Sequence, residues 1–349
     1  MSDITGPAQQ LGLQIEQAGD LPALRAAARQ MDGLVALLYG NGIPIEPLAR
    51  QVCELNHRLF ARLWSRLAPP ELVANSCLIV MGSEGRGEQI LKTDQDNALL
   101  LRDGFAMLGL DEVTARFTAA LIDFGYPPCP GHIMLSNPLW CQPLAAFKQS
   151  LRGWLFDGAD DGVMNLAIFV DAAPVAGDAS LLLEARRFVD EHLVDNDAFF
   201  ARFASAADQF SDGTGWWAKL ASLAGLGDAD SAHEFDLKKL GTFPVVHGAR
   251  ALALQHHLAE LGTVARLQAL ANRQLLPTAT VRELTEALHF LMALKLENNL
   301  RQQRAGQAVS NRVQLASLGT LERDRLKDAL AIIRRFRQHL RQHFRLDAL

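Results

Sequence analysis

The stretch that most constrains the fold is residues 72–102, in which two apolar runs flank a glycine-rich turn. The first run, LVANSCLIVMG, ends at Gly82-Ser83, and the second, ALLLR, follows Asp94 and Asp96. Apolar runs of this length, bounded by turn residues, are typical of buried strands. We therefore expect a strand, a tight turn at Gly82-Ser83, and a returning strand that carries the two aspartates.

The rest of the chain is mostly helical in pattern. LPALRAAARQMDGLVALLYG and PLARQVCELNHRLFARLWSRL both repeat apolar residues at helical spacing before Pro69-Pro70. Helical segments near 111–125, 143–156 and 179–193 then alternate with a third strand-like run, NLAIFVD, at 165–171. We expect no strand after about residue 175.

This layout predicts an α+β fold that is predominantly helical. A small mixed-sheet core domain (71–195) would be flanked by an N-terminal helical segment (1–70) and a C-terminal helical bundle (196–349).

Composition excludes several classes of protein. A net charge of −5 over 349 residues argues against a nucleic-acid binder, which normally carries a basic excess. No run reaches the roughly 18 apolar residues of a membrane span, and the N-terminus MSDITGPAQQ lacks the blocks of a signal peptide. The four cysteines form no CxxC pair, which favours reduced thiols over a zinc site. We expect a cytoplasmic protein without membrane or nucleic-acid partners.

The glycine-rich stretch does not match three common binding motifs. A Walker A loop beginning at Gly82 would need Lys and Ser or Thr where the chain has Glu88 and Gln89. A dinucleotide fingerprint would need a further glycine after Gly87. An EF-hand beginning at Asp94 would need Gly in place of Leu99.

The two aspartates favour a metal site instead. Residues i and i+2 of a strand point to the same face, so Asp94 and Asp96 would project together and repel unless a cation lies between them. Mg²⁺ fits, since it is bound by one or two carboxylates plus substrate phosphates. Gly82 would let the backbone approach a phosphate, Ser83 would offer a hydroxyl and an N–H, and Arg86 would neutralise phosphate charge.

A third carboxylate would complete a two-metal site, and Asp171 is the candidate because it closes the apolar run NLAIFV at the rim of the sheet. Each piece alone also fits an ordinary structural role. A Gly-Ser pair is commonly only a turn, and an Asp-x-Asp pair is commonly a solvated strand end.

The stretch GSEGRGEQILKTDQDNALLL resembles the signature of the DNA polymerase beta nucleotidyltransferase superfamily. It is most similar to bacterial signal-transduction nucleotidyltransferases with the motif GSxGRxEQ…TDQDNAL, which are akin to the uridylyltransferase of the PII signal protein. The segment CPGHIMLSNPLWCQPL (129–144) also fits this family. DLKKLGTFPVVHGARALAL (236–254) and LKLENNLRQQRAGQAVSNRV (294–313) resemble its C-terminal helical, substrate-binding domain.

The resemblance implies an enzyme that transfers a nucleoside monophosphate from a nucleoside triphosphate to a hydroxyl of a protein (PII-like) or small molecule, uridylyl and adenylyl both remaining open. It implies that Asp94, Asp96 and Asp171 ligate one or two Mg²⁺ or Mn²⁺ ions and that Asp171 activates the acceptor hydroxyl. From the helical domain, Lys238 is the residue expected to contact the triphosphate, because ligand pockets favour domain interfaces.

Two departures from the family pattern keep a second function open. The family commonly has Asp-x-Arg-Pro where this chain has Asp171-Ala172-Ala173-Pro174, and often has regulatory domains where this chain has only helices. The alternative is a nucleotide-binding regulatory module without turnover, which partners a separate sensor protein.

Overall fold

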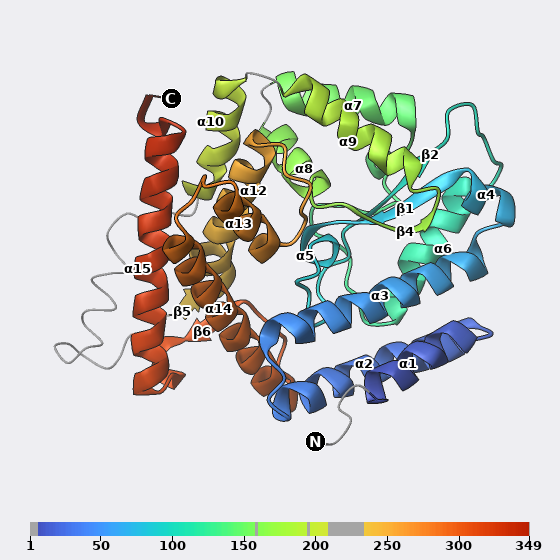
Figure 1. Ribbon diagram of the computed structural model, residues 1–349. Helices are drawn as coiled ribbons and strands as arrows, with labels where there is room; N and C mark the ends of the chain where they lie inside the picture. Colours follow the sequence, from blue (N-terminus) through green and yellow to red (C-terminus); the bar gives the residue numbers. More distant parts are fainter. Residues whose placement is uncertain (1–5, 158–159, 194–195, 209–233, 349) are drawn as a thin grey trace. The chain divides into compact units, whose positions relative to one another are not determined.

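The computed structural model describes residues 6–157, 160–193, 196–208 and 234–348. The chain divides into two units, Met1–Val194 and Asp195–Leu349, which we call the first and the second unit (Figure 1).

The first unit is built around a small mixed sheet of order β3-β2-β1-β4. β1 pairs antiparallel with β2 and β4, whereas β2 pairs parallel with β3. Every residue of β1 and β2 is buried, as expected for central strands covered on both faces. The strands are β1 (Ser76–Val80), β2 (Asn97–Leu101), β3 (Cys141–Pro143) and β4 (Ala173–Gly177).

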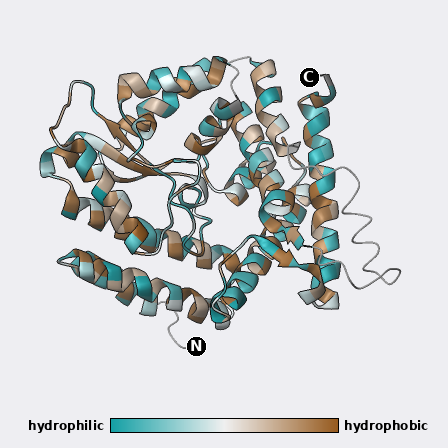
Figure 2. Ribbon diagram, turned by 180° about the vertical axis from the view of Figure 1, so that it is seen from behind, coloured by the Kyte–Doolittle hydropathy of each residue, from teal (hydrophilic) through white to brown (hydrophobic). Residues whose placement is uncertain are grey.

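Helices cover both faces of this sheet. In Figure 1, α7 and α9 lie on one side and α3 and α6 on the other, and Figure 2 shows the strands in hydrophobic colours. The N-terminal helices α1 and α2 pack against α3. The helices of this unit are α1 (Gly6–Gln17), α2 (Leu21–Gly40), α3 (Ile45–Leu67), α4 (Pro70–Ala74), α5 (Gly82–Gly85), α6 (Leu110–Asp123), α7 (Leu144–Phe156), α8 (Asp160–Phe169) and α9 (Ser180–His192), with a 3₁₀ turn η1 (Pro138–Trp140).

One expected strand is wrong. Residues 165–169 of the run form the end of helix α8, residues 170–171 form a turn, and the strand β4 begins only at Ala173. Buried Val163, Leu166 and Phe169 recur at helical spacing, but a short apolar run reads the same way for a buried strand and a buried helix. Asp171 therefore lies in the turn between α8 and β4.

The second unit is almost entirely helical. Its central helix α12 is buried at every position from Pro244 to Leu254 and packs against α10, α13 and α15. A methyl group on Gly248 would lie 2.6 Å from Phe336 Cε1, so this glycine allows α12 and α15 to approach closely. The helices are α10 (Asp197–Ser205), α12 (Phe243–Gln255), α13 (Thr263–Asn272), α14 (Thr278–Arg304) and α15 (Thr320–His343), with short turns η2 (Ala206–Asp208), η3 (Leu237–Thr242), η4 (Leu315–Ser317) and η5 (Leu346–Ala348).

The expectation that no strand follows residue 175 is also wrong. β4 extends to Gly177, and β5 (Glu234–Asp236) pairs antiparallel with β6 (Arg312–Gln314). Three-residue strands leave no alternating pattern long enough to recognise in a sequence.

The expected fold class is confirmed: the protein is α+β and predominantly helical, with a small mixed sheet. Among the described residues, no helix is both long enough and apolar enough to cross a membrane.

Candidate active site

The turn after β1 is a single turn of helix, α5, that begins at Gly82. Gly82 has a φ of +58°, a conformation that costs other residues roughly 1–2 kcal/mol. A methyl group at this position would lie 2.6 Å from Asp96 Oδ2. The absence of a side chain at Gly82 thus gives the Asp96 carboxylate room directly beside the turn.

The acidic segment, which we define as Thr93–Asp96, lies next to this turn. Both aspartates precede β2 rather than lie on it, because the strand begins at Asn97. Two backbone bonds nevertheless keep the segment extended: Gln95 N–H donates to the Pro127 carbonyl (3.1 Å), and Met81 N–H donates to the Asp96 carbonyl (2.9 Å).

Within this segment, the two carboxylates differ in setting. Asp94 is exposed, and Asp96 is half-buried. The Asp96 charge also acts on Cys129, whose thiol has its pKa raised to about 11 by burial and then by this carboxylate. Cys129 belongs to the segment CPGHIMLSNPLWCQPL, but nothing in the sequence indicated that it would lie beside Asp96.

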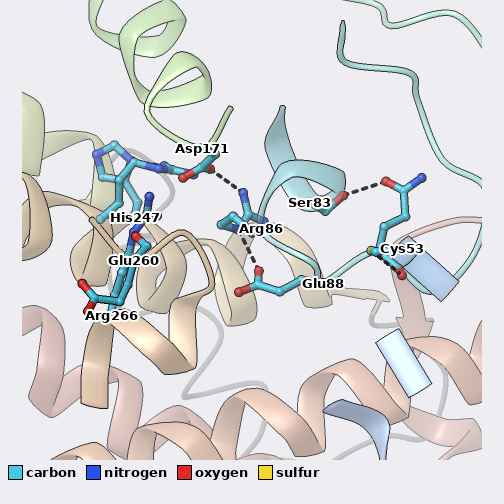
Figure 3. A network of polar contacts seen from close by, with 10 residues as sticks. Cys53, Ser83, Arg86, Glu88, Asp171, His247, Glu260 and Arg266 are labelled. Atoms are coloured by element: carbon cyan, nitrogen blue, oxygen red, sulfur yellow. Dashed lines mark hydrogen bonds and ion pairs between the residues drawn. The ribbon is translucent and has the colours of Figure 1, made fainter. Parts of the chain in front are cut away.

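The third predicted carboxylate is held differently. Asp171 is wholly buried, and its Oδ2 accepts from Arg86 Nη1 at 2.6 Å, while Arg86 Nε donates to Glu88 Oε2 at 2.7 Å (Figure 3). A methyl group on Gly85 would lie 2.0 Å from the Asp171 carbonyl oxygen, so Gly85 permits α5 to pack against this turn. Burial alone would lower the pKa of Arg86, but Glu88 and Asp171 outweigh burial and raise it. Arg86 is thus a fixed cation between two carboxylates.

The arginine that the family pattern places before Pro174 is absent, and another arginine lies nearby. Arg186 of α9 donates a hydrogen bond to the Ala172 carbonyl, next to Asp171.

A buried hydrogen-bond network links α3 to Glu84 of α5. Asn56 Nδ2 donates to Glu84 Oε2 (2.9 Å), and Tyr126 donates its hydroxyl to Asn56 Oδ1 (2.6 Å). His57 Nε2 lies 3.4 Å from Glu84 Oε1. Burial raises the pKa of the Glu84 carboxyl to about 8 and lowers that of His57. An acid in the first turn of a short helix is normally exposed, so this network could not be predicted from the sequence.

The donor set beside Gly82 fits a hard divalent cation. Asp96 has a carboxylate oxygen beside Gly82, and Asp94 lies two residues earlier in the same segment, so a substrate phosphate would complete the coordination of a bound ion. Among the described residues, no group of three His, Cys, Asp or Glu side chains is placed to hold a metal. Asp171 contacts Arg86 through Oδ2, and its part in a metal site stays a prediction from the sequence.

In the second unit, the residue predicted to contact triphosphate is at the surface. Lys238 is exposed in η3, and its backbone N–H donates to Asp236 Oδ1 at 3.0 Å. His247 and Arg250, by contrast, are buried in α12. Arg250 can only donate, so its 3.0 Å contact to His247 Nδ1 requires that His247 Nε2 carry the proton and donate to the Phe203 carbonyl (2.6 Å).

A strand that ends in a Gly-Ser turn beside an Asp-x-Asp segment, within a small mixed sheet, is the arrangement anticipated for a nucleotidyltransferase. Comparison with known families agrees. Residues 29–161 match the model described as "Putative nucleotidyltransferase DUF294", and residues 197–344 match "Putative nucleotidyltransferase substrate binding domain". The chain belongs to this nucleotidyltransferase family and carries its C-terminal substrate-binding domain. No curated protein matches the chain.

Proposed function

We propose that the protein transfers a nucleoside monophosphate from a nucleoside triphosphate to an acceptor hydroxyl, with release of pyrophosphate. The observation that carries this proposal is the meeting of Gly82 and Asp96, which brings the glycine turn and the acidic segment together in a nucleotidyltransferase-family chain.

The residues beside the turn have distinct roles in this proposal. Asp94 and Asp96 would hold one or two Mg²⁺ or Mn²⁺ ions, and Gly82 and Ser83 would receive the phosphates. The bound metal would supply positive charge against the triphosphate and the developing charge of the reacting oxygens. Because much of this catalysis is positioning, the buried contacts behind α5 matter as much as the groups that touch substrate.

In the transfer step, the acceptor oxygen forms a bond to the α-phosphorus of the nucleoside triphosphate. The bond from the α-phosphorus to the oxygen that bridges it to the β-phosphorus breaks, and pyrophosphate leaves with that oxygen. The hydroxyl proton needs a base, for which Asp171 is the proposed residue. Its pairing with Arg86 makes the carboxylate a weaker base, so Arg86 would have to exchange partners, for which the incoming phosphates are suitable anions.

The same ion pair favours a second candidate function. If Arg86 stays on Asp171, the site would bind Mg²⁺ and a nucleotide through Asp94 and Asp96 without transferring it. The protein would then be a nucleotide-binding regulatory module that partners a separate sensor protein.

Label transfer distinguishes the two functions. The protein is incubated with Mg²⁺ and each of the four α-³²P-labelled nucleoside triphosphates, with a cell extract as the source of protein and small-molecule acceptors. Label in a PII-like protein, in another protein, or in a small molecule would identify the acceptor class, and the productive triphosphate would identify the base.

The control is a variant that loses the same charge elsewhere. Asp94→Asn with Asp96→Asn should abolish transfer, whereas Asp111→Asn with Glu112→Gln, two exposed acids of α6, should not. Mg²⁺-dependent binding without transfer to any acceptor would support the regulatory module. Neither binding nor transfer by the wild type would reject both functions.

A further inference from the structure

Gln89 lies in the loop that joins α5 to the acidic segment, and it is only 5% exposed. Its carbonyl oxygen accepts a hydrogen bond from the Cys53 thiol of α3 at 3.3 Å (Figure 3). The loop is therefore anchored to the same helix that supplies the buried partners of Glu84.

The side chain of Gln89 contacts the two functional segments at once. Its Oε1 accepts from Ser83 Oγ at 2.9 Å and from Thr93 Oγ1 at 3.1 Å. Ser83 belongs to the turn proposed to receive phosphate, and Thr93 directly precedes Asp94. One buried amide oxygen thus joins the phosphate turn to the start of the acidic segment.

A second bond joins the same two segments at the other end. Met81 N–H, just before α5, donates to the Asp96 carbonyl at 2.9 Å. The acidic segment is held at Thr93 by Gln89 and at Asp96 by the backbone. Asp94 lies between these two fixed residues, and Asp96 is itself one of them. Buried hydrogen bonds are costly to lose when their partners cannot reach water, so both contacts should persist in the folded protein.

We propose that Gln89 is a positioning residue, which keeps Ser83 and the acidic segment in one register so that a metal-bound triphosphate meets both together. This role rests on the proposed function, and Gln89 itself would not touch the nucleotide. Substitution of Gln89 should mainly reduce the factor by which Mg²⁺ strengthens nucleotide binding. Mg²⁺ could still bind the acidic segment and the nucleotide could still bind the turn at Ser83, but the two would no longer be held together.

The binding test compares Gln89→Met with a matched control. Methionine preserves the length of the side chain, but its sulfur is only a weak acceptor in place of the amide oxygen. Gln142→Met is the control, because Gln142 Oε1 accepts a similar bond from Ser150 Oγ (3.1 Å) on another part of the first unit. Equilibrium dialysis with labelled ATP, CTP, GTP and UTP, each with Mg²⁺ or with EDTA, gives the factor by which Mg²⁺ strengthens nucleotide binding.

We expect Gln89→Met to reduce that factor at least fivefold and Gln142→Met to change it less than twofold. Gln89→Glu, which keeps an acceptor for both hydroxyls, should restore part of the factor. A factor within twofold of the wild type in Gln89→Met would overturn the proposal.

Hydrogen exchange tests the same role without any nucleotide. Gln89→Met should increase amide exchange in both residues 82–88 and residues 93–96, while β1 and the control variant stay as in the wild type. Increased exchange in only one segment, or in neither, would overturn the proposal. If the wild type binds no nucleotide, the proposed function fails, and exchange alone still decides whether Gln89 joins the two segments.

A pair of hydroxyl deletions guards against simple misfolding. Ser83→Ala with Thr93→Val should reproduce the exchange pattern of Gln89→Met, and adding Gln89→Met to this pair should have little further effect. Additive effects would show that Gln89 acts by another route, which would also overturn the proposal.

Discussion

Two regions of the candidate site offer carboxylates to the same short helix, α5, in opposite ways. The acidic segment has an exposed Asp94 and a half-buried Asp96, and Asp96 lies beside Gly82. Asp171, beside Gly85, is fully buried and already paired with Arg86. The two carboxylate regions therefore differ in burial, and a cation could bind Asp171 Oδ2 only in exchange for its contact with Arg86. A carboxylate's surroundings, more than its presence, decide what it can bind.

The largest expected effect is on stability and comes from the buried pair. Arg86→Met removes the cation that contacts the buried Asp171 and Glu88, so the free energy of unfolding should fall by about 3–5 kcal/mol. Arg102→Met, which breaks the largely exposed pair with Asp178, should have a much smaller effect. Urea unfolding monitored by circular dichroism measures both changes.

The acidic segment supplies the contrast. Asp94→Asn should leave the unfolding free energy within about 0.5 kcal/mol of the wild type, as for most exposed positions. Similar losses for Arg86→Met and Asp94→Asn would show that the two regions do not differ as their burial indicates.

Glu84 extends the comparison to a buried carboxyl without a fixed cation. Its pKa is raised to about 8 by burial, so the folded state binds a proton that the unfolded state releases near pH 4.5. The stabilising contribution is complete below that lower value and is lost as the pH rises towards 8. Since one pKa unit corresponds to about 1.4 kcal/mol, the loss should amount to a few kcal/mol.

Glu84→Gln tests this contribution, because glutamine keeps an oxygen for Asn56 but does not titrate. We expect the unfolding free energy of the wild type, minus that of the variant, to fall steadily from pH 5 to pH 8. The lowered pKa of His57 acts in the opposite sense, destabilising the fold as the pH falls through 6.5. A pH-independent difference between wild type and variant would mean that Glu84 is ionised throughout.

The comparison also shows which parts of the site could be read from the sequence. The meeting of Gly82 and Asp96 was predictable, because a strand, a turn and a returning strand bring near neighbours in the chain together. The setting of Asp171 was not, because the run before it has no period that separates helix from strand. The contacts of buried Glu84 with Asn56 and of the Gln89 carbonyl with Cys53 depend on α3, which lies tens of residues away in the sequence.

One methyl group at Gly82 would collide with the Asp96 carboxylate. Gly82→Ala should destabilise the protein by about 1–2 kcal/mol through its positive φ, and should also displace the Asp96 carboxylate that lies 2.6 Å from the new atom. Gly87→Ala is the matched control, because Gly87 has a φ of +71° and open space at the methyl position.

The two variants should therefore lose similar stability but differ in metal binding. We expect Gly82→Ala to weaken Mn²⁺ binding, measured by electron paramagnetic resonance, by roughly tenfold relative to Gly87→Ala, a difference of about 1.4 kcal/mol. Equal Mn²⁺ affinity in the two variants would mean that Gly82 and the Asp96 carboxylate beside it do not form the metal site. The acidic segment would then bind a cation no better than the buried Arg86–Asp171 pair does.

The smallest expected effect belongs to Lys238, whose role remains a prediction from sequence. An exposed ammonium near a phosphate in water is worth about 1 kcal/mol, so Lys238→Ala should weaken the binding of labelled nucleoside triphosphates about fivefold at low salt. Lys239→Ala is the control, because both lysines follow Asp236 and both backbone N–H groups donate to its carboxylate. The Lys238 effect should shrink in 0.5 M salt, as an exposed charge is screened, whereas the contribution of the half-buried Asp96 should be screened much less. Equal affinities for the two lysine variants at low salt would restrict the nucleotide contacts predicted here to the first unit.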